Sequence, residues 1–151
     1  YVSGTPQTCL SVGFNYRAPK MWFFELNGTY MGDSYISLAP NRHEERSDIL
    51  SNFNSLDEYE AWITDFTKQD KLKNAFVVNA SIGKVIYLNR SASMNINLNV
   101  NNLLNNRNIQ TSGYQQCRIN TKDYLTTTTR YPNKYYYAQG LKVFLNMGIK
   151  F

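Results

Sequence analysis

The chain has 151 residues, a mean hydropathy of −0.48 and a net charge of +5, and 15% of its residues are aromatic. It contains no apolar run as long as a membrane-spanning helix, which excludes a helical membrane protein. The Lys and Arg residues are scattered and no predicted helix carries a basic stripe, so nucleic-acid binding is not expected. A β-barrel remains compatible with this composition, because the alternating strands of a barrel average out as polar.

The chain starts with residues typical of a loop, and two predicted strands follow. Residues 1–8 carry no signal-peptide pattern, and we expect the chain to be the C-terminal part of a longer protein. Apolar and polar side chains alternate over 9–16 and again over 21–36, on either side of a short proline-containing turn at 17–20. Glu25 falls on the more polar side of the second strand. It would be costly in the core of a soluble protein but not in a water-filled lumen.

The region 37–74 is predicted to be a long polar connection with one helix inside it. Ser55 and Glu58 match the S-x-x-E capping box, and apolar residues follow at helical spacing up to Lys68. The carboxylates of the first turn are explained by the helix dipole better than by catalysis. His43 is the single histidine, and a solvated loop explains it better than a metal site. Without a nucleophile, base and orienting group together, we predict neither an enzyme nor a metal centre.

Three further strands are predicted over residues 75–88, 92–104 and 135–151. The middle one alternates apolar residues with asparagines, and such a ladder makes a poor protein core but a good water-facing wall. The last one has an apolar side with aromatic ends and a small or polar side with two lysines. At a tilt of about 40°, residues 137–151 would cover roughly 35 Å of height, enough to cross the hydrocarbon core of a bilayer.

Short and long connections alternate along the chain, with turns at 17–20 and 89–91 and loops at 37–74 and 105–134. Strands joined in this way are antiparallel, so all short turns lie at one end, as in outer-membrane barrels. Five strands cannot close a barrel, and open edges in lipid leave backbone groups unpaired, so we expect further strands upstream. The predicted fold class is therefore all-β: an antiparallel transmembrane β-barrel segment with one short helix in an external loop and the C-terminus on the periplasmic side.

Two stretches near the C-terminus resemble a known protein family. Residues 99–118, NVNNLLNNRNIQTSGYQQCR, contain a V-x-N-L-x-N-like motif followed by an N-I-x-x-(S/G)-G-Y-x-Q-like stretch. Residues 130–151, RYPNKYYYAQGLKVFLNMGIKF, contain a P-x-x-Y-Y-x-x-G-like element in near register and end on an aromatic residue. Over about the last third of the chain these stretches resemble the C-terminal end of the SusC/RagA-like TonB-dependent outer-membrane transporters of Bacteroidetes-type bacteria.

The resemblance implies a plugged barrel of about 22 strands that imports a nutrient such as an oligosaccharide or a peptide without a cofactor. It implies a SusD-like lipoprotein lid and the TonB complex as partners, together with outer-membrane lipid. The plug and the TonB-contacting segment would lie outside this chain. The resemblance also implies that the terminal strand is the signal read by the outer-membrane assembly machinery. The residues of that signal would be Tyr135, Tyr137, Leu141, Val143, Leu145, Met147, Ile149 and Phe151.

The predicted external loops hold the candidates for substrate or lid binding, since loops on a rigid scaffold carry binding function. Cys9 and Cys117 fall toward the loop end and could form a disulfide in an oxidising compartment, with two independent thiols as the alternative. Aromatic candidates could stack on a sugar ring, with self-packing of the loop as the alternative, and polar ones could contact substrate or lid. The candidates are Tyr59, Trp62, Tyr114, Gln115 and Arg118.

Three other functions stay open from the sequence. A passive porin-type channel would share the strands but lack a plug domain. An outer-membrane barrel enzyme would need its catalytic groups upstream or in the loops. A soluble extracellular β-sandwich that binds carbohydrate would pack the apolar sides of its strands together in a dry interior, whereas a barrel would expose them to lipid.

Overall fold

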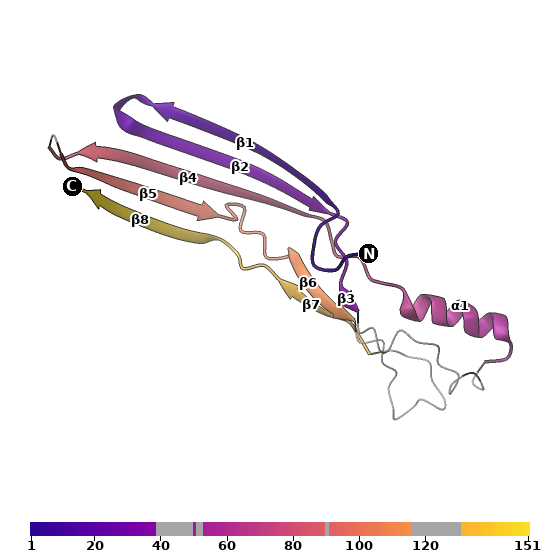
Figure 1. Cartoon of the computed structure of the whole chain (residues 1–151). Helices are drawn as coiled ribbons and strands as arrows, with labels where there is room; N and C mark the ends of the chain where they lie inside the picture. The colour runs from indigo at the N-terminus through magenta and orange to yellow at the C-terminus, as the bar shows by residue number, and fades with distance from the viewer. Residues whose placement is uncertain (39–49, 51–52, 90, 116–130) are drawn as a thin grey trace. The chain divides into compact units, whose positions relative to one another are not determined.

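The computed structural model describes residues 1–38, 50, 53–89, 91–115 and 131–151. It confirms a mostly β protein with a five-stranded antiparallel sheet and one α-helix, and it adds a three-stranded sheet (Figure 1). The chain divides into two compact units, which are described separately. The sheet unit comprises Gln7–Gly32, Asn74–Ile109 and Tyr137–Phe151, and the loop unit comprises Tyr1–Pro6, Asp33–Lys73 and Gln110–Tyr136.

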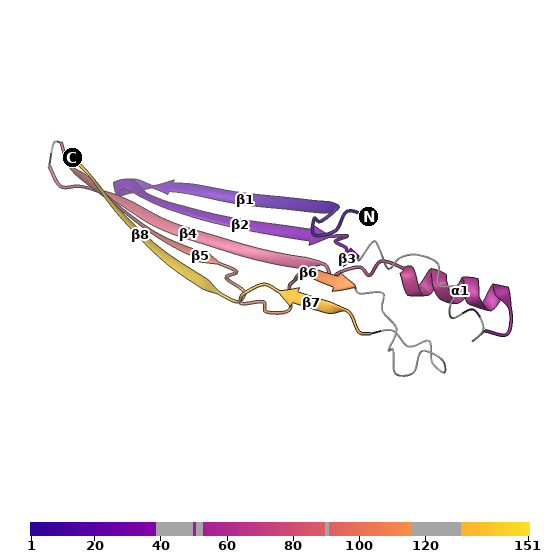
Figure 2. The same cartoon turned by 60° about the horizontal axis from the view of Figure 1, so that its bottom comes forward.

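The five-stranded sheet pairs its strands in the order in which they occur along the chain. The order is β1-β2-β4-β5-β8, and every neighbouring pair is antiparallel. Figures 1 and 2 show the strands side by side in one twisted sheet, with β1 and β8 at its two edges. Among the described residues the sheet is open. The strands are β1 (Thr8–Ala18), β2 (Trp22–Gly32), β4 (Ala75–Tyr87), β5 (Ser93–Asn101) and β8 (Lys142–Lys150).

Short turns join β1 to β2 and β4 to β5. The first is a 3₁₀ turn over Pro19–Met21, in which Lys20 takes a positive φ of 60°. In the second, the Asn89 Oδ1 atom accepts hydrogen bonds from the backbone N–H groups of Ser91 and Ala92, at 2.9 and 2.7 Å. An asparagine side chain that caps its own turn in this way is a common turn device, so both turns are built from local sequence.

Two strands are shorter than the sequence analysis predicted. The alternation extended them to residues 36 and 104, but β2 ends at Gly32 and β5 ends at Asn101. The residues that follow, Asp33 and Asn102, both have a φ of 54°. This left-handed conformation cannot continue an extended strand, and Asp and Asn are the non-glycine residues that adopt it most readily.

The prediction of one continuous strand over 135–151 is wrong. The segment splits into β7 (Lys134–Tyr137) and β8, and residues 138–141 between them are not in a strand. Here the Ala138 N–H donates to the carbonyl of Ile109 at 2.8 Å, and the Leu141 N–H donates to Asn105 Oδ1 at 3.0 Å. These loop contacts take the hydrogen bonds that a neighbouring strand would otherwise supply.

The loop unit contains a small sheet that the sequence did not predict. β3 (Ser37–Leu38) pairs in parallel with β6 (Gln110–Gln115), and β7 lies on the other side of β6. Both β3 and β6 fall in segments that were expected to be loops. A two-residue strand has no periodicity to detect, and the sequence of β6, QTSGYQ, has no apolar alternation.

The helix of the loop unit, α1 (Leu56–Thr67), begins as the capping box predicts. The Ser55 Oγ atom accepts a hydrogen bond from the Glu58 N–H at 3.2 Å. The Glu58 carboxylate reaches back to the backbone N–H of Asn54 at 3.1 Å, one residue further than in a standard box. No helix among the described residues is both long and apolar enough to cross a membrane.

Candidate functional site

The five-stranded sheet presents apolar side chains on one face across its whole width. Directly paired residues of antiparallel strands project to the same side, so the register decides which residues share a face. One row joins Phe14, Leu26, Ala80, Val100 and Val143, with one residue from each strand. Because side chains alternate along each strand, the rows two residues away lie on this side as well.

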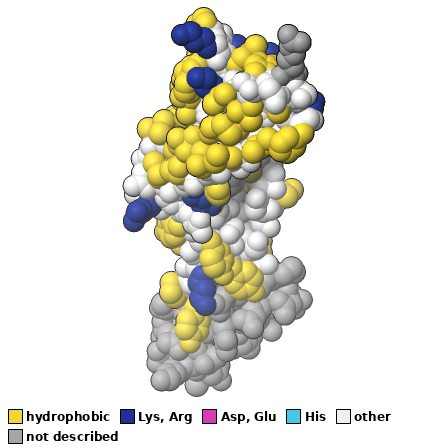
Figure 3. Space-filling view, turned by 90° about the vertical axis from the view of Figure 1, so that its left-hand side faces the viewer, with side chains coloured by type: hydrophobic (Ala, Val, Ile, Leu, Met, Phe, Trp, Pro, Cys, Tyr) yellow, Lys and Arg dark blue, Asp and Glu magenta, His cyan; other side chains and the backbone are white. Residues whose placement is uncertain are grey.

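We call this surface the apolar face. Its side chains are well exposed, with Val12 at 67% and Leu145 at 61% of their accessible area, and Figure 3 shows hydrophobic side chains gathered in a broad patch. Soluble monomers rarely expose contiguous apolar patches larger than a few hundred Å². The larger members of the face are Leu10, Val12, Phe14, Tyr16, Trp22, Phe24, Leu26, Tyr30, Phe76, Ile82, Ile86, Met94, Ile96, Leu98, Val100, Val143, Leu145, Met147 and Ile149.

The apolar side chains of the terminal strand are exposed. In a β-sandwich the apolar face would be packed against a second sheet about 10 Å away and would be dry. Leu141, Val143 and Leu145 are instead 45%, 54% and 61% exposed. The apolar face is therefore exposed on the sheet unit, and its side chains do not bury one another.

The opposite surface, which we call the polar face, carries hydrogen-bonded amides, hydroxyls and one carboxylate. Between β1 and β2, Ser11 Oγ lies 3.0 Å from Thr29 Oγ1 and 3.2 Å from Asn27 Nδ2. Further along, Asn15 Nδ2 donates to Glu25 Oε1 at 2.7 Å. Glu25 thus lies among polar groups, on the more polar side of its strand as the alternation predicted.

The asparagine ladder of β5 also belongs to the polar face. Asn97 and Asn99 are joined side chain to side chain at 3.5 Å, and Ser81 Oγ of β4 donates to Asn97 Oδ1 at 3.4 Å. Asn97 is paired directly with Asn146 of β8. The ladder therefore lies on the side opposite the apolar residues, so the sheet has one polar face and one apolar face.

A shallow open pocket of about 400 Å³ lies at the end of the sheet where the short turns are. Its lining includes Arg17, Phe23 and Glu25, all three of which fall on the polar face by register, together with Trp22. The pocket combines one cation, one carboxylate that accepts a hydrogen bond from Asn15, and two aromatic rings. These groups could hold a polar chain against the polar face.

The two stretches that carry the family resemblance contact each other through Asn102. This side chain is only 6% exposed. Its Nδ2 atom donates to the carbonyls of Asn106 and Gln139, at 2.9 and 3.2 Å, and its Oδ1 atom accepts from the Asn106 N–H at 3.1 Å. Asn102 thus satisfies every polar atom of its amide group while fastening the segment before β8, a role that sequence spacing could not reveal.

Tyr59, one of the aromatic candidates for sugar stacking, lies on α1 with its side chain buried in a small hydrophobic core. Tyr59 is 2% exposed and forms a core with Phe66, against which Phe53, Trp62 and Ile63 pack. The Trp62 ring is partly buried and stacks on Phe66 with centroids 4.6 Å apart. The structure therefore supports self-packing for Tyr59, and Trp62 keeps only part of its surface for any ligand.

The polar candidates have separate fates. Gln115 is fully buried, and its Nε2 atom donates to the carbonyls of Lys68 and Phe66, at 3.0 and 3.4 Å. Its Oε1 atom accepts from the Asp70 N–H at 3.4 Å, so its role is to join β6 to the end of α1, and the prediction that it contacts substrate or lid is wrong. Tyr114 is 39% exposed and remains accessible. Arg118 lies outside the described residues.

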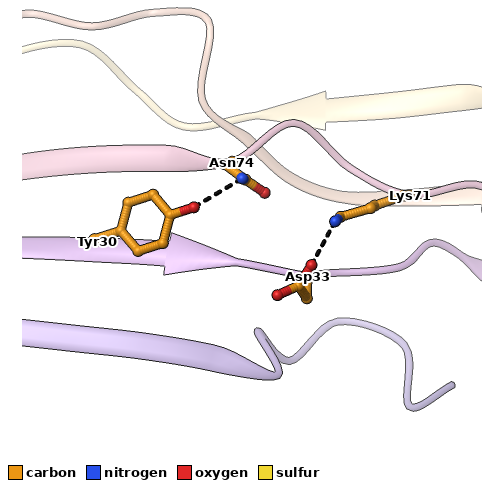
Figure 4. A network of polar contacts seen from close by, with 4 residues as sticks. All are labelled: Tyr30, Asp33, Lys71 and Asn74. Atoms are coloured by element: carbon orange, nitrogen blue, oxygen red, sulfur yellow. Dashed lines mark hydrogen bonds and ion pairs between the residues drawn. The ribbon is translucent and has the colours of Figure 1, made fainter.

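Figure 4 shows two further polar contacts that the sequence did not predict, one in each unit. In the sheet unit, Asn74 Nδ2 donates to the Tyr30 hydroxyl at 2.8 Å, which joins the ends of β2 and β4. In the loop unit, the Lys71 ammonium forms an ion pair with the Asp33 carboxylate, and both side chains are over 40% exposed. An exposed ion pair of this kind contributes about 0–1 kcal/mol to the free energy of unfolding, so it adds little to stability.

The surroundings of Tyr35 shift its pKa. Its ring stacks on that of Tyr1 with centroids 4.0 Å apart. Desolvation and, after it, the neighbouring Tyr1 hydroxyl raise the pKa of Tyr35 above the usual tyrosine value. Tyr35 therefore stays neutral throughout the physiological range, and nothing in this arrangement activates it as an acid or a base.

The remaining candidates are placed as follows. Val143 to Ile149 project their odd-numbered side chains from β8 onto the apolar face, and Phe151 after the strand is 91% exposed. Cys9 is exposed on β1. Cys117 and His43 lie outside the described residues, so the disulfide stays a prediction. Among the described residues, no group of three or more His, Cys, Asp or Glu side chains could hold a metal ion.

Comparison with protein-family models, curated proteins and solved structures finds no match to this chain. The resemblance to SusC/RagA-like transporters accordingly depends on the motifs in residues 99–118 and 130–151 alone.

Proposed function

We propose that the five-stranded sheet is part of the wall of a transmembrane β-barrel in a bacterial outer membrane. Its apolar face would meet lipid tails, and its polar face would line a water-filled lumen. The observation that carries this proposal is the continuous exposed apolar face on one side of the sheet, with hydrogen-bonded amides on the other. Barrel walls have this alternation of apolar-out and polar-in side chains.

The dimensions of the apolar face support the proposal. Along β2 it runs from Trp22 to Tyr30, and this span of about eight residues corresponds to roughly 20 Å of height at a 40° tilt. Tyr16 and Phe24 lie beside Trp22, and Phe76 is paired with Tyr30 at the other end. Aromatic girdles on both sides of an apolar band about 25 Å tall are typical of outer-membrane barrels.

The edges of the sheet support a barrel larger than this chain. β1 and β8 each have a neighbour on one side only among the described residues. In a bilayer, every backbone group left without a hydrogen bond costs several kcal/mol, so both edges need partner strands. Further strands of the same protein, about 22 in all if the family resemblance holds, would close the wall.

From the resemblance, we propose that the whole protein is a TonB-dependent importer of an oligosaccharide or a peptide. Its partners would be a SusD-like lipoprotein lid and the TonB complex, and the latter would act through regions outside this chain. The short turns would face the periplasm, and the loops at 37–74 and 105–134 would face outward. In this proposal the chain supplies wall and external loops and carries out no chemistry.

The second candidate is a passive porin-type channel, because a porin would have the same wall. The two differ in their energy source. Cells that produce the protein are supplied with labelled oligosaccharides and peptides, with TonB present, with TonB deleted, and after the proton-motive force is dissipated. Active import predicts that uptake is lost in the last two conditions. Uptake that persists in both contradicts the importer and supports the porin.

A further inference from the structure

The apolar face carries one charged side chain among its described strand residues, that of Lys84 in β4. By register, Lys84 is paired with Trp22 of β2 on one side and with Ile96 of β5 on the other. Along its own strand, the neighbours that share its face are Ile82 and Ile86. A cation at such a position is costly unless the environment of the face becomes polar at this level.

The Lys84 ammonium is held over the indole of Trp22. Its Nζ atom lies 4.9 Å from the ring centroid, within the range of a cation–π interaction. The Trp22 ring in turn stacks near Phe24, and Phe24 near Tyr16, with centroids 6.3 and 6.4 Å apart. Lys84 thus lies beside a cluster of aromatic rings at the short-turn end. Lysines and tryptophans are typical of the boundary between lipid tails and headgroups, where the lysine stem covers apolar surface and its charged end reaches water.

No described carboxylate forms an ion pair with Lys84. Glu25, the carboxylate at this end of the sheet, projects from the polar face and accepts a hydrogen bond from Asn15. The other charged side chains at the short-turn ends of the described strands are all cations. They are Arg17, Lys20 and Lys150. The Lys84 ammonium therefore lies in a positive region, with an aromatic ring on one side and no anionic partner among the described residues.

We propose that Lys84 and Trp22 bind the phosphate of an anionic phospholipid in the leaflet at the short-turn end. This rests on the proposed membrane wall. An ammonium costs about 2–4 kcal/mol at the midplane of a barrel but only about 0–1 kcal/mol near the interface, which places Lys84 at headgroup level. Phosphate is the anion that lipids present at that level, and an ammonium binds it through charge-assisted hydrogen bonds.

The test is native mass spectrometry of the detergent-purified full-length protein, titrated with phosphatidylglycerol or with phosphatidylcholine. We expect Lys84→Gln to weaken the tightest phosphatidylglycerol binding about five-fold, as the loss of one lysine near an anionic surface predicts, and to leave phosphatidylcholine binding unchanged. Lys84→Arg keeps the charge and should bind like the wild type. Lys150→Gln removes a cation from the polar face at the same end and should also have no effect.

Three results would overturn the proposal: unchanged phosphatidylglycerol binding in Lys84→Gln, an equal loss for both lipids, or displacement of the lipid by inorganic phosphate, which would indicate a site for the free ion. Should Lys84→Gln fail to form a heat-modifiable barrel, Trp22→Leu takes its place and should weaken the same lipid preference. If the protein forms a barrel but binds both lipids equally, only this inference is wrong. If its apolar face does not contact lipid, the proposed membrane wall is wrong as well.

Discussion

Phe23 and Gly83 show how single residues shape the polar face. They are paired across β2 and β4, and the phenylalanine ring covers the glycine. A Cβ atom added at Gly83 would lie 2.1 Å from Phe23 Cζ, with two further ring atoms within 2.7 Å. The ring and the glycine therefore fit together only because position 83 lacks a side chain.

We expect Gly83→Ala to destabilise the protein by about 1–3 kcal/mol, because the ring must leave its place or push the strands apart. Gly148→Ala is the matched control, since Gly148 lies in β8 and a Cβ atom there meets nothing within 4 Å. The measurement is urea unfolding of the protein in lipid vesicles. Equal midpoints and slopes for the two variants would show that the ring has room to move.

Residues with local partners could be predicted from the sequence, and residues with distant partners could not. Ser55 caps the helix by accepting a hydrogen bond from Glu58, three positions away, and the S-x-x-E motif predicts that contact. Asn102 binds the carbonyl of Gln139, and Gln115 binds that of Lys68. No pattern in the sequence specifies those pairs, so Gln115 was predicted to face a ligand when it is in fact fully buried.

At the scale of elements, the alternation of apolar and polar residues predicted the strands of the large sheet, because each strand has one polar and one apolar side. The alternation gave a wrong prediction where it continues through residues that pair with no strand. Alternation continues from Tyr135 to Phe151, yet residues 138–141 are held by the loop that contains Asn105 and Ile109. Side-chain alternation reports which face a residue occupies and is silent on which partner takes its backbone hydrogen bonds.

The two sides of one strand should respond in opposite ways to a new charge. Leu26 lies midway along the apolar face of β2, and Asn27 is its neighbour on the polar face. A lysine near the midplane on the lipid side of a barrel costs about 2–4 kcal/mol, whereas a lysine in the lumen is solvated. We expect Leu26→Lys to lower the folded fraction in lipid vesicles, measured as the band that migrates faster without heating.

Asn27→Lys is the control for this experiment. It gives up an exposed hydrogen bond to Ser11 and a half-buried one from Thr29, which together contribute about 1–3 kcal/mol at most, and it should fold better than Leu26→Lys. If both variants fold equally well, or if Asn27→Lys is the worse of the two, the assignment of the two faces is wrong.

At the scale of the whole chain, the described residues form an open sheet with one apolar face and two edges, and a second compact unit of helix, small sheet and loops. Hydrophobic burial usually drives folding by packing apolar faces against each other. The large sheet keeps its apolar face exposed, so the sheet by itself would be poorly stable in water. The sequence indicated the two faces through the alternation of apolar and polar residues in each strand, and the register shows that like sides line up across five strands.

The most direct test of this account is the accessibility of spin labels on the two faces of the protein in lipid bilayers. With Cys9 and Cys117 replaced by serine, single cysteines at Leu98 and Leu145 report on the apolar face, and cysteines at Asn97 and Asn146 report on the polar face. The account predicts frequent collisions with oxygen and few with a water-soluble nickel complex at the first pair, and the reverse at the second. Labels at Leu98 and Leu145 that meet the nickel complex, or that are shielded from both reagents, would contradict it.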